Sequence, residues 1–480
     1  MELALIFIPL LLATAIGLLI KRQRVIEWVS VVATVVAFTA SLLVARQVAV
    51  RGVYAVGQFF SVDALGAIVM LIIAFVGLAV TAYAVFYLRT EMTHGIIGFR
   101  RVRQLYVLLS LFLVAMFLAA TSSSPIFTWL SIEATTLATA FLISFYNKPT
   151  AMEAAWKYLI INSVGLLLAF FGTLLYLTVL EGSGGADFPT WSSLLANAAH
   201  LDPLIAKIAF VFALIGYGTK MGLAPMHTWL PDAHSKAPVP ISALLSGVLL
   251  NVAFFAVIKC KGVTDLAVGP DFSQKLLIAF GVLTIGIAAL IVVIQKNYKR
   301  LLAYSSMENM GILALGFGFG GLGIFAALLH TLYHALLKSA FFLTVGNVFL
   351  KYGTTKIHQV QGALRILPVT SVLLLIGFLA ITGAPPFGIF FTKIYILSAG
   401  MQQHPFVSII VLLFMAVLFY GFFKHITSMV FGTAPADMQP GQQSAWLTIP
   451  PLVLVVIALY LSLHLPAFLN TLVHAAAAKY

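Results

Sequence analysis

Residues 328–346 read LLHTLYHALLKSAFFLTVG, an apolar run that carries three titratable side chains. His330, His334 and Lys338 stand at i, i+4 and i+8, so in an α-helix they share one face and extend over roughly 12 Å. The run around them, residues 322–350, exceeds the length of about 20 apolar residues that crosses a bilayer. Three stacked titratable groups favour a proton relay over isolated structural histidines. A zinc pair at this spacing has no evident third ligand.

The whole chain shares this apolar character. Its 480 residues are 62% hydrophobic and only 9% charged, whereas soluble domains are about half apolar and about a quarter charged. The net charge of +13 does not indicate nucleic-acid binding, because the basic residues sit singly or in small groups between apolar runs. The single cysteine, Cys260, excludes a disulfide framework or an iron–sulfur cluster held by this chain alone.

Apolar runs recur along the sequence and predict an all-α polytopic membrane protein that binds lipid, with about 14 transmembrane helices. The predicted spans are residues 3–20, 25–45, 62–88, 105–121, 126–146, 156–180, 204–226, 239–259, 275–295, 301–318, 322–350, 367–398, 406–430 and 447–468.

Basic residues in the short loops predict the orientation. The odd-numbered loops carry fifteen lysines and arginines against five in the even-numbered loops. Such an excess marks the cytoplasmic side. Both termini are therefore expected on the non-cytoplasmic side of a bacterial or archaeal plasma membrane.

Two predicted spans contain helix breakers. The seventh includes Gly216, Gly218, Gly222 and Pro225, and the twelfth includes a cluster of the same kind, formed by Gly383, Pro385, Pro386 and Gly388. Proline removes a backbone donor and clashes one turn back. We therefore predict that helices 7 and 12 are broken rather than merely kinked.

Buried ionisable residues recur at nearly constant spacing, which predicts an internal repeat. Glu133 and Glu308 are 175 residues apart, Lys220 and Lys393 are 173 apart, and Asn251 and Lys424 are 173 apart. Each repeat would contain five helices, and an odd number inverts the second repeat in the membrane. The predicted divisions are residues 1–104 (three helices and a loop), 105–260 and 261–430 (two five-helix half-channels), and 431–480 (a C-terminal helix).

Charges at bilayer depth mark the candidate site, because each costs at least about 3 kcal/mol there. Glu133, Lys220, Lys338 and Lys393 are the clearest cases. The alternatives are a structural ion pair for Glu133 and snorkelling to the interface for Lys220 and Lys393. Glu308 could instead pair with the basic loop 296–300, and Lys424 could lie near a helix end.

These residues permit proton transfer. Burial penalises the charged form of a lysine and a nearby carboxylate restores it. Movement of Glu133 relative to Lys220 would therefore change whether the lysine holds its proton. The proton could pass through buried water and the two histidines to Lys338 and Lys393.

Four motifs carry a family resemblance: KMGLAPMHTWLPDAHSKAPVPISALLSG (220–247), KRLLAYSSMENMG (299–311), HTLYHALLKSAFFLTVG (330–346) and GAPPFGIFFTK (383–393). Together they resemble the antiporter-like proton-translocating subunits of respiratory complex I, Mrp antiporters and membrane-bound hydrogenases. Within that superfamily the chain most resembles hydrogenase-4 component F. The resemblance covers about residues 60–430.

The resemblance implies fourteen core helices, two inverted half-channels and a role for each matching residue. Glu133 would couple to a neighbouring subunit, and Lys220 would be the buried lysine of helix 7. The central axis would be formed by His330, His334 and Lys338. Lys393 would be the terminal lysine, and His227 and His234 would lie in the loop that begins helix 8. Many relatives carry a lysine where this chain has Asn251. Because an amide cannot carry the proton, water or a histidine must serve that step.

Three functions remain open at this stage. The first is a proton-pumping subunit of a multi-subunit oxidoreductase, most simply a membrane-bound [NiFe]-hydrogenase-like complex or a complex I-type NADH dehydrogenase. Its partners would be other membrane subunits and a peripheral arm, whose chains would hold the NiFe and Fe–S centres, with no cofactor on this chain. The second is a subunit of a sodium/proton antiporter. The third is a membrane scaffold that does not pump, for which the buried charges would be dispensable.

Overall fold

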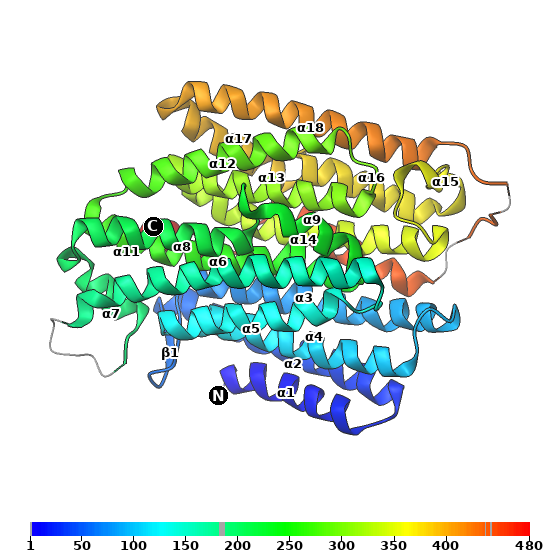
Figure 1. The fold of residues 1–480 in the computed structure, drawn as a ribbon, viewed down its shortest axis with the longest axis horizontal. Helices are drawn as coiled ribbons and strands as arrows, with labels where there is room; N and C mark the ends of the chain where they lie inside the picture. Colours follow the sequence, from blue (N-terminus) through cyan, green and yellow to red (C-terminus); the bar gives the residue numbers. More distant parts are fainter. Residues whose placement is uncertain (1, 182–187, 437, 442–443) are drawn as a thin grey trace.

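The computed structural model describes residues 2–181, 188–436, 438–441 and 444–480 and shows long helices lying side by side (Figure 1). Helices prevail because backbone polar groups at bilayer depth must be satisfied within the segment. The long helices are α1 (Glu2–Leu19), α2 (Gln23–Arg51), α3 (Ala64–Thr93), α4 (Phe99–Thr121), α5 (Pro125–Ile143), α6 (Pro149–Glu181), α8 (Pro203–Met221), α11 (Leu250–Val268), α12 (Asp271–Val292), α13 (Tyr298–Phe319), α14 (Leu322–Tyr352), α16 (Pro368–Thr382), α17 (Gly388–Gln403), α18 (Pro405–Phe431), α19 (Ile449–Leu463) and α20 (Ala467–Lys479).

Short elements complete the chain. They are α7 (Trp191–Asn197), α9 (Trp229–Lys236), α10 (Val239–Leu244), α15 (Ala363–Ile366), the 3₁₀ turns η1 (Ala198–His200), η2 (Met226–Thr228), η4 (Ile357–Gln359) and η5 (Ala445–Leu447), and the π-helical turn η3 (Leu245–Leu249). The strands β1 (Tyr54–Val56) and β2 (Phe60–Val62) form an antiparallel hairpin with Tyr54 opposite Val62. The predicted all-α class is therefore confirmed, with this hairpin as a small addition.

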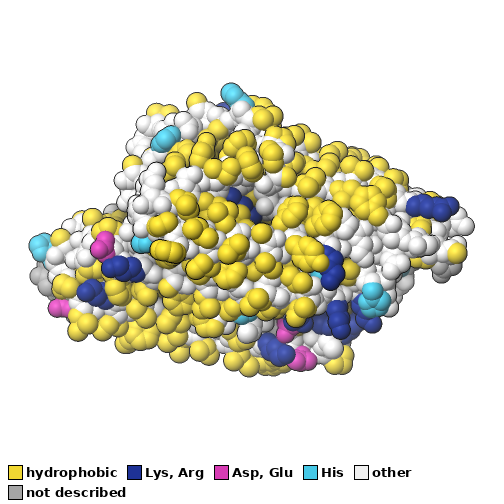
Figure 2. Space-filling model, turned by 90° about the horizontal axis from the view of Figure 1, so that it is seen from above, with side chains coloured by type: hydrophobic (Ala, Val, Ile, Leu, Met, Phe, Trp, Pro, Cys, Tyr) yellow, Lys and Arg dark blue, Asp and Glu magenta, His cyan; other side chains and the backbone are white. Residues whose placement is uncertain are grey.

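The helices have the length and composition of membrane spans. Within the described residues, eleven helical segments are long and apolar enough to cross a membrane, and twelve if the bent pair α19 and α20 counts as one. The chain is thus a multi-pass membrane protein, and the total of fourteen crossings stays a prediction. A broad apolar band covers much of the face seen in Figure 2, and most of the basic side chains lie toward its two ends.

Both predicted helix interruptions are present. α8 ends at Met221 with Gly222 at φ 83°, and α16 ends at Thr382 with Gly383 at φ 96°. Glycine adopts this left-handed conformation readily and so ends a helix. Gly216 and Gly218, which we predicted to be breakers, lie inside α8 instead. Gly216 serves packing, because a Cβ there would come within 2.5 Å of the Ala169 nitrogen on α6.

The interruptions do not follow the spacing of the lysines. Lys220 lies before its break, in α8, whereas Lys393 lies after its break, in α17. Gly222 and Gly383, which cap the two breaks, are 161 residues apart, against 173 for the lysines. The two lysines therefore do not occupy equivalent positions relative to the breaks. The inverted repeat and the division boundaries stay predictions.

The last predicted span is not a single straight helix. α19 and α20 meet at 74° around residues 464–466. Pro466 offers no backbone donor and disfavours helical geometry in the residue before it. The predicted C-terminal helix is thus two helices.

α14 occupies the centre of the bundle and positions the candidate site. It contacts helices from both predicted halves and from the N-terminal segment, namely α3, α10, α13, α16, α17 and α19. Its His330, His334 and Lys338 are completely buried.

Candidate functional site

Lys220 and Glu133 meet through a hydroxyl rather than directly. Lys220 Nζ donates to Thr136 Oγ1 at 2.9 Å, and Thr136 Oγ1 donates to Glu133 Oε2 at 3.3 Å. Glu133 and Thr136 are one turn apart on α5, so both reach the end of α8. Lys220 is completely buried and Glu133 is half-buried. The two charged groups are therefore coupled by one intervening side chain.

Helix α6 supplies the remaining partners of this pair. Tyr158 OH accepts a second hydrogen bond from Lys220 Nζ at 2.6 Å, and the ammonium lies 4.8 Å from the tyrosine ring centroid. Ser163 Oγ donates to Glu133 Oε1 at 2.8 Å. Neutral oxygens and a ring face stabilise the ammonium without neutralising it.

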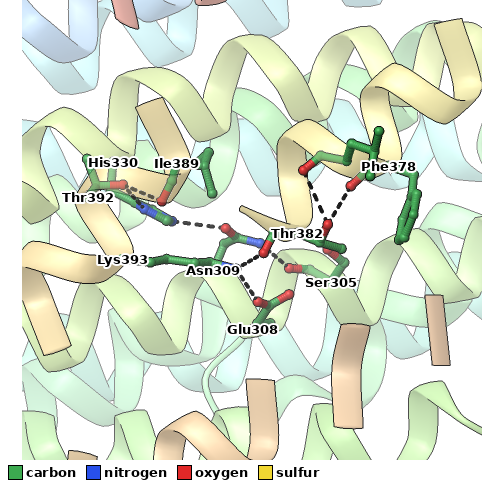
Figure 3. Close-up of polar contacts among 10 residues, drawn as sticks. Ser305, Glu308, Asn309, His330, Phe378, Thr382, Ile389, Thr392 and Lys393 are labelled. Atoms are coloured by element: carbon green, nitrogen blue, oxygen red, sulfur yellow. Dashed lines mark hydrogen bonds and ion pairs between the residues drawn. The ribbon is translucent and has the colours of Figure 1, made fainter. Parts of the chain in front are cut away.

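Lys393 and Glu308 form a direct ion pair (Figure 3). Their Nζ and Oε1 atoms are 2.6 Å apart, and both side chains are nearly inaccessible. Lys393 Nζ also donates to the Thr382 carbonyl at 3.3 Å. That carbonyl ends α16 and has no helical partner, because the helix is interrupted there. The broken helix thus supplies a ligand to the lysine.

His330 is fixed between α13 and α17, as Figure 3 shows. Its Nε2 donates to Asn309 Oδ1 at 2.9 Å, and its Nδ1 lies 2.9 Å from Thr392 Oγ1. Thr392 directly precedes Lys393, and Asn309 directly follows Glu308. His330 is therefore bonded to both elements that carry the ion pair.

The next two groups along α14 lack such anchors. Among the described residues, neither ring nitrogen of His334 nor Nζ of Lys338 has a hydrogen-bond partner. The rings of His330 and His334 are nearly parallel, with centroids 6.5 Å apart. A buried polar group without a partner is costly. Such groups are the ones that bound water or a change of protonation would satisfy.

His234 is a third group of this kind. It lies on α9, is completely buried and stacks on Phe342 of α14 at 5.0 Å between centroids. Within the part of the chain that the structure describes, both its ring nitrogens are unpaired. His227, in η2, is 8% exposed. It lies directly after the break that follows Lys220.

Asn251 follows the π-helical turn η3. Its Nδ2 donates to the Gly247 carbonyl at 2.7 Å, and its Oδ1 is buried without a partner among the described residues. A π turn frees backbone groups and often marks a functional position. Gly247 allows α14 to approach, because a Cβ there would lie 2.1 Å from Ser339 Oγ.

Lys424 differs from the other predicted site residues. It is exposed on α18, where it lines a shallow surface pocket. A long basic side chain on an exposed helix face can extend its charge to the aqueous phase. The prediction of Lys424 in a buried path is therefore not supported, and we leave it out of the proposal below.

A separate ion cluster joins the start of α3 to α11 and α20. Asp63 caps α3 through the Gly66 nitrogen, and its carboxylate accepts from Lys259 Nζ at 2.6 Å and Lys479 Nζ at 2.8 Å. Burial raises the pKa of the Asp63 carboxyl, but the two lysine charges outweigh burial and hold that pKa below its usual range. The cluster ties the N-terminal segment to the last helix.

The family described as NADH:quinone oxidoreductase/Mrp antiporter, TM, matches residues 122–419. This chain belongs to that family. The hydrogenase-4 component F homolog of Methylacidiphilum infernorum (isolate V4) is 36% identical over 88% of this chain and 90% of its own length. The resemblance inferred from the four motifs is therefore confirmed.

Two solved structures share the fold of this family member. The membrane-bound sulfane sulfur reductase, an archaeal respiratory membrane complex, contains a chain with a TM-score of 0.87 and 23% identity, covering 100% of this chain and 98% of that one. A chain of the Mrp complex from Dietzia sp. DQ12-45-1b also has a TM-score of 0.87, with 20% identity and coverage of 100% and 97%. The overall fold of this antiporter-like subunit is thus shared with both kinds of complex.

Several residues of this antiporter-like chain escaped the sequence analysis. Thr136, Tyr158 and Asn309 are neutral, and neutral polar residues are too common in membrane helices to stand out. Only Thr136 left a signal, since it lies one turn after Glu133. The π turn η3 left none, because its sequence LSGVL is ordinary for a helix.

Proposed function

We propose that this chain is the proton-translocating subunit of a multi-subunit membrane oxidoreductase, in which buried side chains carry protons between the Lys220 and Lys393 sites. The proposal rests on one observation. Two buried lysines, each with its own carboxylate, flank a central helix whose His334 and Lys338 have no partner among the described residues. Such ionisable groups in a membrane bundle are costly and mark ion pathways.

The Glu133 site would couple this chain to its neighbour. Glu133 is half-buried, so a charge on an adjacent subunit could act on it. If Glu133 moves away from Thr136, the ammonium of Lys220 loses the negative charge that Thr136 links to it and releases a proton more readily. Return of Glu133 would favour proton uptake. The hydroxyl of Thr136 sets the geometry of both states.

The central groups would carry the released proton. Nitrogen atoms of His234, His334 and Lys338 have no hydrogen-bond partner among the described residues and could bind water. His330 bonds to both elements of the Glu308–Lys393 pair. The amide of Asn251 cannot take up a proton near neutral pH, but it can orient water. The proton would end on Lys393, beside Glu308.

The relative from Methylacidiphilum supports a hydrogenase-4-like complex for this chain. The partners would be other membrane subunits and a peripheral hydrogenase or complex I-like arm that holds the NiFe and Fe–S centres. We place both termini on the non-cytoplasmic side, from the distribution of basic loops. The second candidate is a subunit of a sodium/proton antiporter without redox partners, because the family also includes Mrp antiporters.

The test is proton transport by the complex that contains this chain, reconstituted in vesicles and driven by its own redox reaction. Lys220→Ala and Lys393→Ala should each abolish transport and leave the soluble-side redox chemistry largely intact. Matched controls are Lys207→Ala on α8 and Lys424→Ala on α18, both exposed, which should transport at the wild-type rate. Wild-type transport in the first pair would overturn the proposal and favour a scaffold.

A second measurement separates the two ion assignments. If purification yields antiporter-like subunits alone and vesicles exchange sodium for protons without an electron donor, the antiporter function replaces the redox-driven one. Sodium-independent transport that needs the donor supports the proposal as stated.

A further inference from the structure

Helix α3 carries a second polar line, outside the residues considered so far. Tyr83, Tyr87 and Glu91 stand at i, i+4 and i+8 and are completely buried. This spacing places them on one face over roughly 12 Å. Glu91 lies in the last turn of α3, next to the loop 94–98 and the basic residues Arg100, Arg101 and Arg103. We call this side of the bundle the basic end.

Hydrogen bonds and one ring contact connect the half-buried Tyr146 with α14. Tyr146, half-buried after α5, donates to Glu91 Oε1 at 2.5 Å and lies 3.2 Å from Tyr87 OH. Tyr83 stacks on Tyr87 at 5.7 Å between centroids and donates to Asn347 Oδ1 of α14 at 2.9 Å. The line therefore begins where Tyr146 meets the surface and ends on the central helix.

Close helix packing maintains this arrangement. A Cβ on Gly346 would lie 2.4 Å from Tyr83 OH. α3 can thus approach α14 only because residue 346 is glycine. Asn347 also donates to the Leu447 carbonyl at 3.0 Å, so its amide orientation is fixed.

A buried lysine, Lys299, acts on Glu91 through its charge. Lys299, at the start of α13, is 4% exposed and donates to the Ala237 carbonyl at 2.6 Å. The positive charges of Lys299 and of the exposed Lys148 both act on the Glu91 carboxylate. Ala237 is three residues after His234, whose ring nitrogens are unpaired. Lys299 is therefore bonded to the segment that follows His234, and its charge also acts on Glu91.

A purely structural role fits Glu91 poorly. Its Oε2 is buried without a hydrogen-bond partner among the described residues. A tie between helices would need only Oε1, and a glutamine would provide it without placing a carboxylate in a buried site. The second oxygen is the position that a proton would occupy.

We propose that Glu91 is the group that takes up protons at the basic end and passes them through Lys299 and His234 to Lys338. This inference rests on the proposed function, to which it adds the uptake site. One proton moves and no electron does. A proton from the aqueous phase goes onto Oε2 of the Glu91 carboxylate while Tyr146 holds Oε1. Lys299, once its ammonium has passed a proton toward His234, takes this proton from Glu91 as a neutral amine.

The experiment compares four variants in the reconstituted complex, with the pH varied on the side that the basic loops face. Glu91→Gln should reduce proton transport at least tenfold, and Glu91→Asp should restore a substantial part of it. Tyr146→Phe should retain transport but shift its pH profile by about one unit, because a hydrogen bond to a carboxylate is lost. Glu153→Gln, an exposed carboxylate on α6, should change neither.

The outcomes separate this inference from the proposed function. If Lys393→Ala loses transport while Glu91→Gln keeps the wild-type rate, the uptake site is refuted and the proposed function stands. If Lys393→Ala also transports normally, both fail. If Glu91→Gln and Glu91→Asp both lose transport, and Tyr146→Phe leaves the pH profile unchanged, Glu91 is a structural residue and the inference is overturned.

Discussion

Removal of one partner of the Glu308–Lys393 pair should destabilise the protein more than any surface ion pair does. Two unit charges 2.6 Å apart attract by about 6 kcal/mol at an effective dielectric constant of about 20. The side chains are only 3% and 5% exposed, so the remaining charge could not be rehydrated. Loss of one partner from a buried pair costs about 3–5 kcal/mol. Glu308→Gln should therefore lose most of that amount.

The expected shift in melting temperature follows from the size of the chain. An unfolding entropy of about 2.1 cal/mol/K per residue gives about 1 kcal/mol/K for 480 residues. The single variant should therefore melt about 3–5 °C lower. The double variant Glu308→Gln/Lys393→Met leaves no charge at this pair and should recover most of the loss. Proton transport should stay absent in the double variant, because no titratable group remains at the position of the pair.

The assay is thermal unfolding of the purified complex in detergent, followed by transport in vesicles. Glu153 and Lys157 on α6 provide the control. Glu153 Oε1 and Lys157 Nζ are also 2.6 Å apart, but these side chains are 62% and 49% exposed. Such a pair contributes about 0–1 kcal/mol. The reasoning is refuted if Glu308→Gln lowers the melting temperature no more than Glu153→Gln. It is also refuted if the double variant transports protons.

Three further predictions test other parts of the structure. Thr136→Val should reduce transport about ten- to a hundredfold, since it removes a hydrogen bond to a charged group, whereas Thr178→Val on the exposed side of α6 should have no effect. Lys338→Met should leave the melting temperature unchanged or raise it while abolishing transport, because no described residue bonds its Nζ; a marked drop would reveal a partner. Asp63 has a lowered pKa in the folded state, so its stabilisation is present above the unfolded pKa of about 3.9 and is lost as the pH falls through the folded value. The difference in melting temperature between wild type and Asp63→Asn should accordingly be constant above about pH 5 and shrink below about pH 4, and a difference that grows on acidification would contradict this.

The sequence predicts most of the fold because membrane helices impose strong rules on composition. Apolar runs, glycines and prolines locate the helices and the breaks at Gly222 and Gly383, since satisfaction of backbone groups leaves few alternatives. Gly216 was misassigned because a glycine that ends a helix and one that admits a neighbouring helix look the same in a sequence. The bend near Pro466 was missed because the apolar run continues through it.

The candidate site is predictable only where it is charged. His330, His334 and Lys338 follow from helical periodicity, and all three are buried. The hydroxyl between Lys220 and Glu133 is a tertiary contact between α5 and α8, and no local pattern encodes such a contact. Glu91 was overlooked for a different reason: it lies at the end of its apolar run, where a carboxylate in a loop would be ordinary. Only the structure shows that it is buried and bonded to Tyr146.

The two lysine sites differ in a way that the repeat alone would not give. Lys220 is held by two hydroxyls and reaches a carboxylate only through Thr136, whereas Lys393 contacts its carboxylate directly. Neutral ligands let an amine exchange its proton at modest cost, while a contact ion pair favours the charged form. We infer that Lys220 is the site that a neighbouring subunit switches and Lys393 the site that retains the proton. The variant Thr136→Glu/Glu308→Thr exchanges the two kinds of site. Proton transport driven by the redox reaction should then become slower or reverse its direction, whereas a symmetric path would transport at the wild-type rate.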